Sequence, residues 1–137
     1  MTEVLERTVL VTIGDESDVG IARIRTHRLA IDEGFSDVGA AALATAVSEL
    51  ARNVLVHARS GELLLRVAEQ DGRRGIVAIV RDEGPGIADT EHAMADGCST
   101  AGTLGLGLPS AQRLVDELQI VTVAGAGTTI TAKKWKT

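Results

Sequence analysis

The chain has 137 residues and a formal net charge of −5, and we predict one domain over residues 1–137. Its hydrophobic content is 45%, so a packed core is expected. Only Phe35 and Trp135 are aromatic. The acidic balance, without a dense basic run, disfavours nucleic acid as a ligand. The single cysteine, Cys98, excludes an intramolecular disulfide framework. No signal-type start or apolar 18-residue run occurs, which favours a soluble cytoplasmic protein without a membrane partner.

Hydrophobic periodicity and turn residues divide the chain into predicted helices and strands. In chain order these are a strand at 7–13, helices at about 18–33 and 37–57, strands at 61–70 and 74–81, a helix beginning near Pro109, and strands at 119–123 and 128–135. Ser17 or Asp18 should cap the first helix, and Gly34 should end it. Asp71 and Gly72 are a hairpin signal between two of the strands.

The helix near Pro109 is predicted from its apolar spacing. Ala111, Leu114, Val115 and Leu118 follow the proline at i, i+3, i+4 and i+7, which indicates a helix with one apolar face extending to Leu118. The resulting order is β-α-α-β-β-loop-α-β-β. It predicts an α/β (α+β) two-layer sandwich with a mainly antiparallel sheet and its helices on one face, rather than a parallel Rossmann sheet.

Three polar residues of the second predicted helix share one side. Glu49, Asn53 and His57 lie at i, i+4 and i+8, and each step turns only about 40° beyond a full turn. A carboxylate, an amide and an imidazole in one stripe could hold a hydrated cation and phosphates, and Mg²⁺ prefers such oxygen ligands. The alternative is an ordinary solvated face of the helix.

The segment DEGPG follows an apolar strand directly. Asp82 should therefore lie at the end of the sheet, near the core, while Gly84 and Gly86 would let a flat ligand touch the backbone. A simple turn of Asp, Gly and Pro is the alternative.

Two further glycine-rich segments occur near the C-terminus. Gly102, Gly105 and Gly107 precede the helix at Pro109, and free N–H groups at a helix start bind phosphate. A flexible connection would have the same composition. In AGAGTT, Thr128 enters the last strand and could direct its hydroxyl towards a ligand, although the glycines could equally form a plain hairpin turn.

In order and spacing, these four segments together resemble the ATP-binding domain shared by gyrase, histidine kinases and MutL, the Bergerat fold of the GHKL superfamily. ELARN is similar to its N box, DEGPG to its first glycine box, GLGL to its second and AGAGT to its third. Within the superfamily, VSELARN, DGCST, GLGLPSAQRL and AKKW are most similar to the stressosome switch serine/threonine kinases of the RsbT type, which are related to anti-sigma factors.

The resemblance implies ATP and Mg²⁺ as cofactors and assigns roles by position. Asp82 would accept a hydrogen bond from the adenine amino group, with Thr128 assisting through water. Gly86 would lie against the base, and Gly84 would belong to the same cofactor-binding segment. The phosphates would meet the backbone N–H groups of Gly105, Leu106, Gly107 and Leu108.

Three residues of the second predicted helix carry the remaining implied roles. Asn53 would ligate Mg²⁺, His57 matches a basic position near the phosphates, and Glu49 would be the general base. Phosphoryl transfer needs positive charge near the γ-phosphate, yet no Lys or Arg lies between Asp82 and Leu104. Arg52, Arg113 or a partner protein would have to supply it.

The function implied by this resemblance is an ATP-dependent protein serine/threonine kinase. It would phosphorylate a STAS-domain antagonist or scaffold protein and then activate a metal-dependent serine phosphatase in stress signalling. The alternative within the superfamily is an anti-sigma factor that binds a sigma factor. A detached histidine kinase domain is disfavoured, because the chain has no helical dimerisation segment with a phosphoacceptor histidine.

Overall fold

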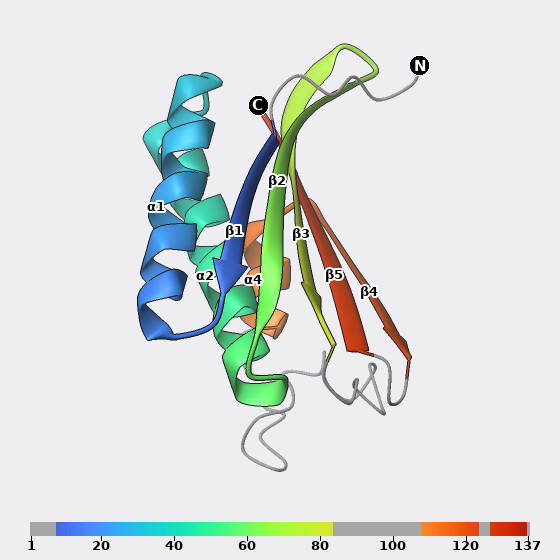
Figure 1. Cartoon of the computed structure of the whole chain (residues 1–137). Coiled ribbons are helices and arrows are strands. Elements are labelled where there is room, and N and C mark those ends of the chain that lie inside the picture. The colour runs from blue at the N-terminus through green and yellow to red at the C-terminus, as the bar shows by residue number, and fades with distance from the viewer. Residues whose placement is uncertain (1–7, 84–107, 124–126, 137) are drawn as a thin grey trace.

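The computed structural model describes residues 8–83, 108–123 and 127–136. Its elements in chain order are β1 (Thr8–Ile13), α1 (Glu16–Asp32), α2 (Asp37–His57), β2 (Gly61–Gln70), β3 (Arg73–Asp82), α4 (Leu108–Leu114), β4 (Glu117–Val123) and β5 (Gly127–Trp135). The order of helices and strands is the predicted one (Figure 1). Of the helices in the described residues, none is long and apolar enough to cross a membrane.

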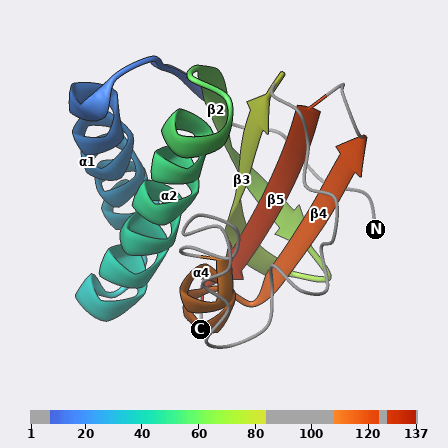
Figure 2. The same ribbon diagram turned by 90° about the horizontal axis from the view of Figure 1, so that it is seen from below.

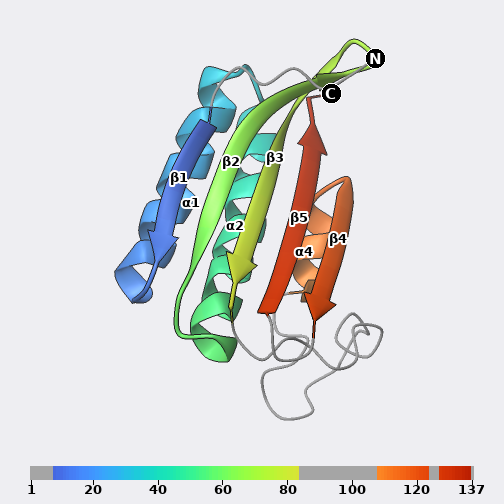
Figure 3. The ribbon, with the colours of Figure 1, turned by 45° about the vertical axis from the view of Figure 1, so that its right-hand side comes forward.

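The strands form one sheet in the order β1-β2-β3-β5-β4, and each neighbouring pair is antiparallel. Figure 3 shows this order with the helices behind the sheet, and Figure 2 shows the helices and strands as two layers from below. Asp71 and Gly72 have φ values of 54° and 77°, as a two-residue hairpin turn requires. The predicted two-layer α+β sandwich is confirmed.

The core lies between the helices and the inner face of the sheet. Alternate strand residues point inwards, so Leu63 and Leu65 of β2 are fully buried, in one core cluster with Leu43 and Leu50 of α2. Burying a leucine side chain stabilises the fold by about 2 kcal/mol. The many alanines of α2 let the helix lie close to the sheet. This packing fixes the face of α2 that carries the polar residues of the N box.

The start of α1 differs from the prediction. Asp15, rather than Ser17 or Asp18, is the N-cap, and its carboxylate accepts a hydrogen bond from the Asp18 backbone N–H at 3.2 Å. Asp18 in turn accepts a hydrogen bond from the Asp15 backbone N–H, so the two carboxylates form a reciprocal capping box. The helix therefore begins at Glu16. Gly34, with φ of 93°, ends this segment as predicted.

The predicted extension of the last helix to Leu118 is wrong. α4 ends at Leu114, and the Asp116 backbone N–H already donates to the Lys133 carbonyl at 2.9 Å. Leu118 lies in β4, opposite Ala132 of β5, and packs against the core from the sheet. Helical spacing misled the prediction because a core-facing strand residue continues the same apolar pattern by coincidence.

Candidate functional site

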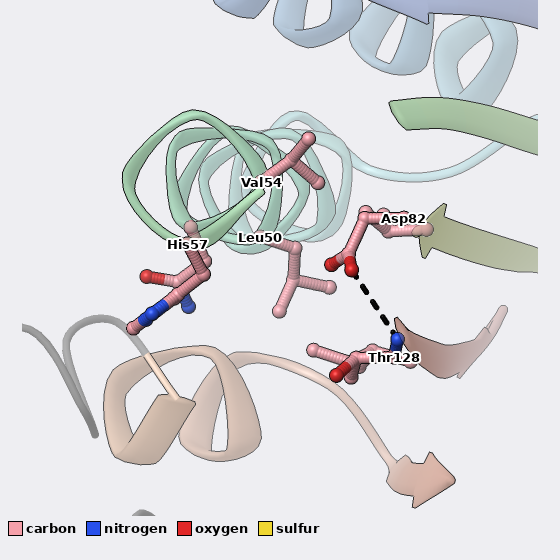
Figure 4. Close-up of a pocket in the computed structure, with 8 residues that line it drawn as sticks. Leu50, Val54, His57, Asp82 and Thr128 are labelled. Atoms are coloured by element: carbon pink, nitrogen blue, oxygen red, sulfur yellow. Dashed lines mark hydrogen bonds between the residues drawn. The ribbon is translucent and has the colours of Figure 1, made fainter. Parts of the chain in front are cut away.

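A cavity lies where the C-terminal half of α2 meets the ends of β3 and β5 (Figure 4). Its lining residues are Leu50, Asn53, Val54, His57, Val80, Asp82, Thr128 and Ile130. Four of them are apolar, and the other four are predicted site residues. Segments about 25 and 45 residues apart along the chain are thus brought to one place by the packing of α2 on the sheet.

Asp82 and Thr128 line the cavity from the sheet, at the ends of β3 and β5. They are register partners in β3 and β5, and the Thr128 backbone N–H donates to Asp82 Oδ1 at 3.3 Å (Figure 4). Thr128 is buried, with 5% of its surface exposed. Gly127, with φ of 110°, allows this close approach, because a Cβ there would lie 2.2 Å from the Asp82 carbonyl oxygen. The Asp82 carboxylate is therefore held at a defined position.

The side chains of Glu49, Asn53 and His57 are divided between the cavity and the remaining surface of α2. Asn53 is buried, and both it and the half-buried His57 line the cavity. Glu49 does not line it. Instead, Glu49 Oε1 accepts a hydrogen bond from Arg52 Nη1 at 3.1 Å, and Arg52 Nε lies 3.8 Å from Glu16 Oε1 of α1. Arg52, one candidate source of positive charge, thus lies between two carboxylates.

Several predicted site residues lie outside the described residues: Gly84, Gly86, Gly105, Leu106 and Gly107. Cys98 lies outside them too. Leu108 is the first residue of α4, and its side chain is buried in the core, so any contact with a ligand would involve its backbone. Arg113 lies in the last turn of α4.

Sequence reasoning missed Thr122 of β4. Its Oγ1 lies 3.1 Å from Thr128 Oγ1 and 3.4 Å from the Gly127 carbonyl oxygen. No motif marks this residue. The signal that could have found it is the predicted hairpin around AGAG, because residues close to a hairpin turn face each other across the two strands.

The arrangement suits a largely apolar group that carries a hydrogen-bond donor such as an amino group. Leu50 and Val54 of α2 face Val80 and Ile130 of the sheet and form apolar walls. The Asp82 carboxylate at the end of the cavity accepts hydrogen bonds only. Small-molecule sites typically combine apolar walls with a few polar groups that fix orientation.

Comparison with known proteins decides the family. The model of the histidine kinase-like ATPase domain matches residues 14–134. The chain belongs to this ATPase family. It is 43% identical over 125 residues to the serine/threonine-protein kinase RsbT of Bacillus subtilis (strain 168), covering 91% of this chain and 94% of that protein.

Two further proteins are similar to this chain. The chain is 34% identical over 97 residues to the anti-sigma F factor of Caldanaerobacter subterraneus subsp. tengcongensis. The aligned part covers 66% of this chain and 66% of that protein. The crystal structure of the RsbU and RsbW domains of Rv1364c from Mycobacterium tuberculosis covers 96% of this chain with a TM-score of 0.67 and 20% identity. The chain spans 33% of that larger chain, and this likeness shows the fold alone.

These findings confirm the predicted resemblance to RsbT-type kinases, the predicted fold and the predicted enzyme class, a protein serine/threonine kinase. ATP is the ligand that the ATPase family implies. The roles assigned to individual residues stay predictions, which the geometry of the cavity allows us to develop.

Proposed function

We propose that the protein transfers the γ-phosphate of ATP to a serine or threonine of a STAS-domain partner, and that the transfer frees it to activate a metal-dependent serine phosphatase. The observation that carries this proposal is the gathering of Asn53, His57, Asp82 and Thr128 around one cavity, in a chain 43% identical to a serine/threonine kinase.

The adenine base would enter the apolar part of the cavity. Asp82 accepts a hydrogen bond from its exocyclic amino group, and a hydrogen bond to a charged group contributes about 1.5–3 kcal/mol. Leu50 and Val54 cover one side of the base and keep water away from this bond. The predicted glycines 84 and 86 would complete the wall.

Asn53 suits a magnesium ligand, because its side chain is buried, lines the cavity and offers a hard amide oxygen. Bound Mg²⁺ would neutralise charge on the phosphates. His57, one helical turn further along α2, would lie near the same phosphates. The backbone N–H groups of residues 105–108 would also bind these phosphates.

Glu49 would act as the general base. It lies one turn before Asn53 on α2, and 32% of its side chain is exposed, so a hydroxyl on another protein can reach it. As the hydroxyl oxygen attacks the γ-phosphorus, Glu49 takes the hydroxyl proton. The bond between the γ-phosphorus and the β,γ-bridging oxygen breaks, and ADP leaves with the electron pair.

The outer side of α1 supports a protein partner. Ile21, Ile24 and Ile31 are 45%, 66% and 39% exposed, and together with the exposed Arg28 they are spaced i, i+3, i+7 and i+10. This is the spacing of a helix-packing stripe. The buried stripe of α1 begins two residues earlier, at Val19, and thus lies about 200° away on the opposite side.

We assign this outer stripe to the STAS-domain acceptor. Three arginines, Arg23, Arg25 and Arg28, are exposed on α1 between residues 20 and 30, without an acidic residue among them. In a protein of net charge −5, such a basic segment complements an acidic partner surface. The contact between Glu16 and Arg52 places the start of α1 beside Glu49, where the acceptor hydroxyl must arrive.

The test is capture of partners from source-cell lysate on the immobilised protein, with and without magnesium-ATP, read by mass spectrometry. We expect a STAS-domain protein that is released on adding ATP and is recovered with phosphoserine or phosphothreonine. Incubation of the purified pair with γ-labelled ATP should reproduce the modification. A STAS-domain protein that binds but never becomes phosphorylated would contradict the proposal.

An anti-sigma factor is the second candidate, favoured by the 34% identity to the anti-sigma F factor. In that case the captured protein would be a sigma factor, which the immobilised protein retains. ATP would then tune binding rather than modify the captured protein.

A further inference from the structure

We propose that Arg52 is a positioning residue that holds the carboxylate of Glu49 for proton transfer, and that Glu16 of α1 in turn holds Arg52. The inference rests on the proposed role of Glu49 as the general base. None of these three side chains lines the nucleotide cavity, so they form a separate group that serves the transfer step and not the binding of ATP.

The guanidinium of Arg52 contacts two carboxylates through different nitrogens. Its Nη1 donates to Glu49 Oε1 at 3.1 Å, and its Nε lies 3.8 Å from Glu16 Oε1. Because a guanidinium is planar and rigid, contacts at two of its nitrogens fix its orientation. Within the part of the chain that the structure describes, Glu49 Oε2 has no hydrogen-bond or ion-pair partner, so this oxygen is left to take a proton.

Glu49 needs such an anchor because its side chain is partly exposed, at 32%. A glutamate side chain has several rotatable bonds and considerable rotamer freedom in solvent. A general base must nevertheless lie within hydrogen-bond reach of the proton that it takes, and a misplacement of about 1 Å can slow a reaction about a hundredfold. An anchor on Oε1 restricts the positions that Oε2 can occupy.

Helical geometry separates the role of Arg52 from that of Asn53. Seen along α2, Asn53 is turned about 40° from Glu49, towards the cavity. Arg52 is turned about 60° from Glu49 in the opposite direction, towards Glu16 of α1. Its positive charge is shared between two carboxylates. Arg52 therefore acts through Glu49 rather than on the phosphates, whose charge the Mg²⁺ at Asn53 would neutralise.

The transfer step then runs through the free oxygen of the base. Glu49 Oε2 takes the proton of the acceptor hydroxyl as the hydroxyl oxygen attacks the γ-phosphorus. The bond between the γ-phosphorus and the bridging oxygen breaks, and its electron pair leaves with ADP. Arg52 keeps its own protons throughout, because a guanidinium is not deprotonated in proteins. It supplies position and no proton.

Glu16 connects this group to the helix that we assign to the acceptor. It is the first residue of α1 and directly follows the N-cap Asp15, whose capping box with Asp18 fixes the start of the helix. The Glu16 side chain is 72% exposed, and exposed ion pairs contribute little to stability. Glu16 therefore orients Arg52 rather than stabilising the fold.

Arg52→Gln removes the anchor. We expect the rate of transfer at saturating ATP and acceptor to fall about tenfold, while the affinity for ATP stays unchanged. Arg52→Lys keeps one donor near Glu49 and should lose less. Glu16→Gln leaves the Arg52 contact with Glu49 in place, so its loss should be only about twofold to fivefold.

The experiment measures single-turnover transfer from γ-labelled ATP to the STAS-domain protein recovered by capture. Arg52→Gln is made both in the wild type and in the Glu49→Gln variant, and thermal unfolding checks folding. A residue that acts only through Glu49 has no effect once the general base is gone. We therefore expect the tenfold loss in the wild-type background and none in the Glu49→Gln background.

The matched control is Arg81→Gln. The Arg81 side chain is 53% exposed, close to the 48% of Arg52, and it pairs with Glu62 at 4.0 Å. It does not line the cavity. Transfer by this variant should equal that of the wild type, which separates loss of the Arg52 anchor from loss of an exposed ion pair in general.

An equal loss in both backgrounds would overturn the inference and give Arg52 a direct effect on the phosphates. Wild-type transfer by folded Arg52→Gln would overturn it too, and unchanged transfer by Glu16→Gln would remove the anchor from α1. If Arg52→Gln does not fold, Arg52→Met replaces it in the same comparison. A wild-type protein that transfers no phosphate would refute the proposed function itself, and the inference with it.

Discussion

Asp82 and Thr128 are 46 residues apart in the chain, yet they are register partners at the ends of β3 and β5, and the Thr128 backbone N–H donates to the Asp82 carboxylate. This contact fixes one oxygen of the carboxylate at the end of the cavity. Because α2 packs over the same strand ends, Asn53 and His57 face this point from the helix layer.

The Asp82→Asn variant tests the adenine contact. An amide can place an NH₂ donor against the amino group of adenine, so we expect ATP to bind about tenfold to a hundredfold more weakly. Isothermal titration calorimetry would measure the change. Glu83→Gln removes a neighbouring exposed carboxylate outside the cavity lining and should bind ATP as the wild type does. Equal affinity of both variants would refute the assigned role of Asp82.

The Glu49→Gln variant separates binding from transfer. Glu49 does not line the cavity, so ATP affinity should change little, whereas transfer should slow at least about a hundredfold without the general base. Calorimetry and single-turnover transfer to the STAS-domain acceptor measure the two effects. Transfer at the wild-type rate would remove Glu49 from the mechanism.

The Gly127→Ala variant should damage both the fold and the site. A methyl group there would lie 2.2 Å from the Asp82 carbonyl oxygen, at a φ of 110° that disfavours alanine. We expect a loss of at least about 2 kcal/mol in the free energy of unfolding, measured by chemical denaturation, and weaker ATP binding. Gly20→Ala is the control, because nothing lies within 4 Å of the added Cβ and alanine stabilises a helix by about 1 kcal/mol.

The Ile24→Glu variant tests the outer stripe of α1. Ile24 is 66% exposed, so its replacement should leave stability and ATP affinity nearly unchanged. A charged side chain at the centre of an apolar contact should weaken capture of the STAS-domain acceptor at least about tenfold. Val38→Glu, which changes an 81% exposed valine on α2, should leave capture unaltered. Pull-down titration compares the two, and equal capture by both would place the interface elsewhere.

The cap of α1 predicts a dependence of stability on pH. A hydrogen bond from the Ser17 hydroxyl, with a further one from the Asp18 backbone, lowers the pKa of Asp15 below 3.8. Because the folded-state pKa is depressed, this stabilisation is present above 3.8 and is lost as the pH falls through the folded-state pKa. Asp15→Asn keeps a capping oxygen but does not titrate. Thermal unfolding from neutral to acidic pH should show a wild-type advantage that shrinks below 3.8; a constant difference would contradict this account.

Local patterns were sufficient to predict most of the fold. The alanine-rich run from Ser36 to His57, the Asp71-Gly72 turn and the alternation in β2 and β3 each carry their own conformational preference. The four-residue spacing of Asn53 and His57 placed both on one side of α2, and both line the cavity. Local patterns failed at Leu118, where helical and strand spacing coincide.

The arrangement at the site depended on contacts between distant segments. Only the antiparallel register of β4, β5 and β3 brings Thr122 behind Thr128 and Thr128 against Asp82. Only the packing of α1 on α2 places Glu16 near Arg52, whereas the pair of Arg52 and Glu49 is a local i,i+3 contact within α2. Strand register and the direction of hydrogen bonds arise from the simultaneous burial of many side chains, and no short stretch of sequence specifies them.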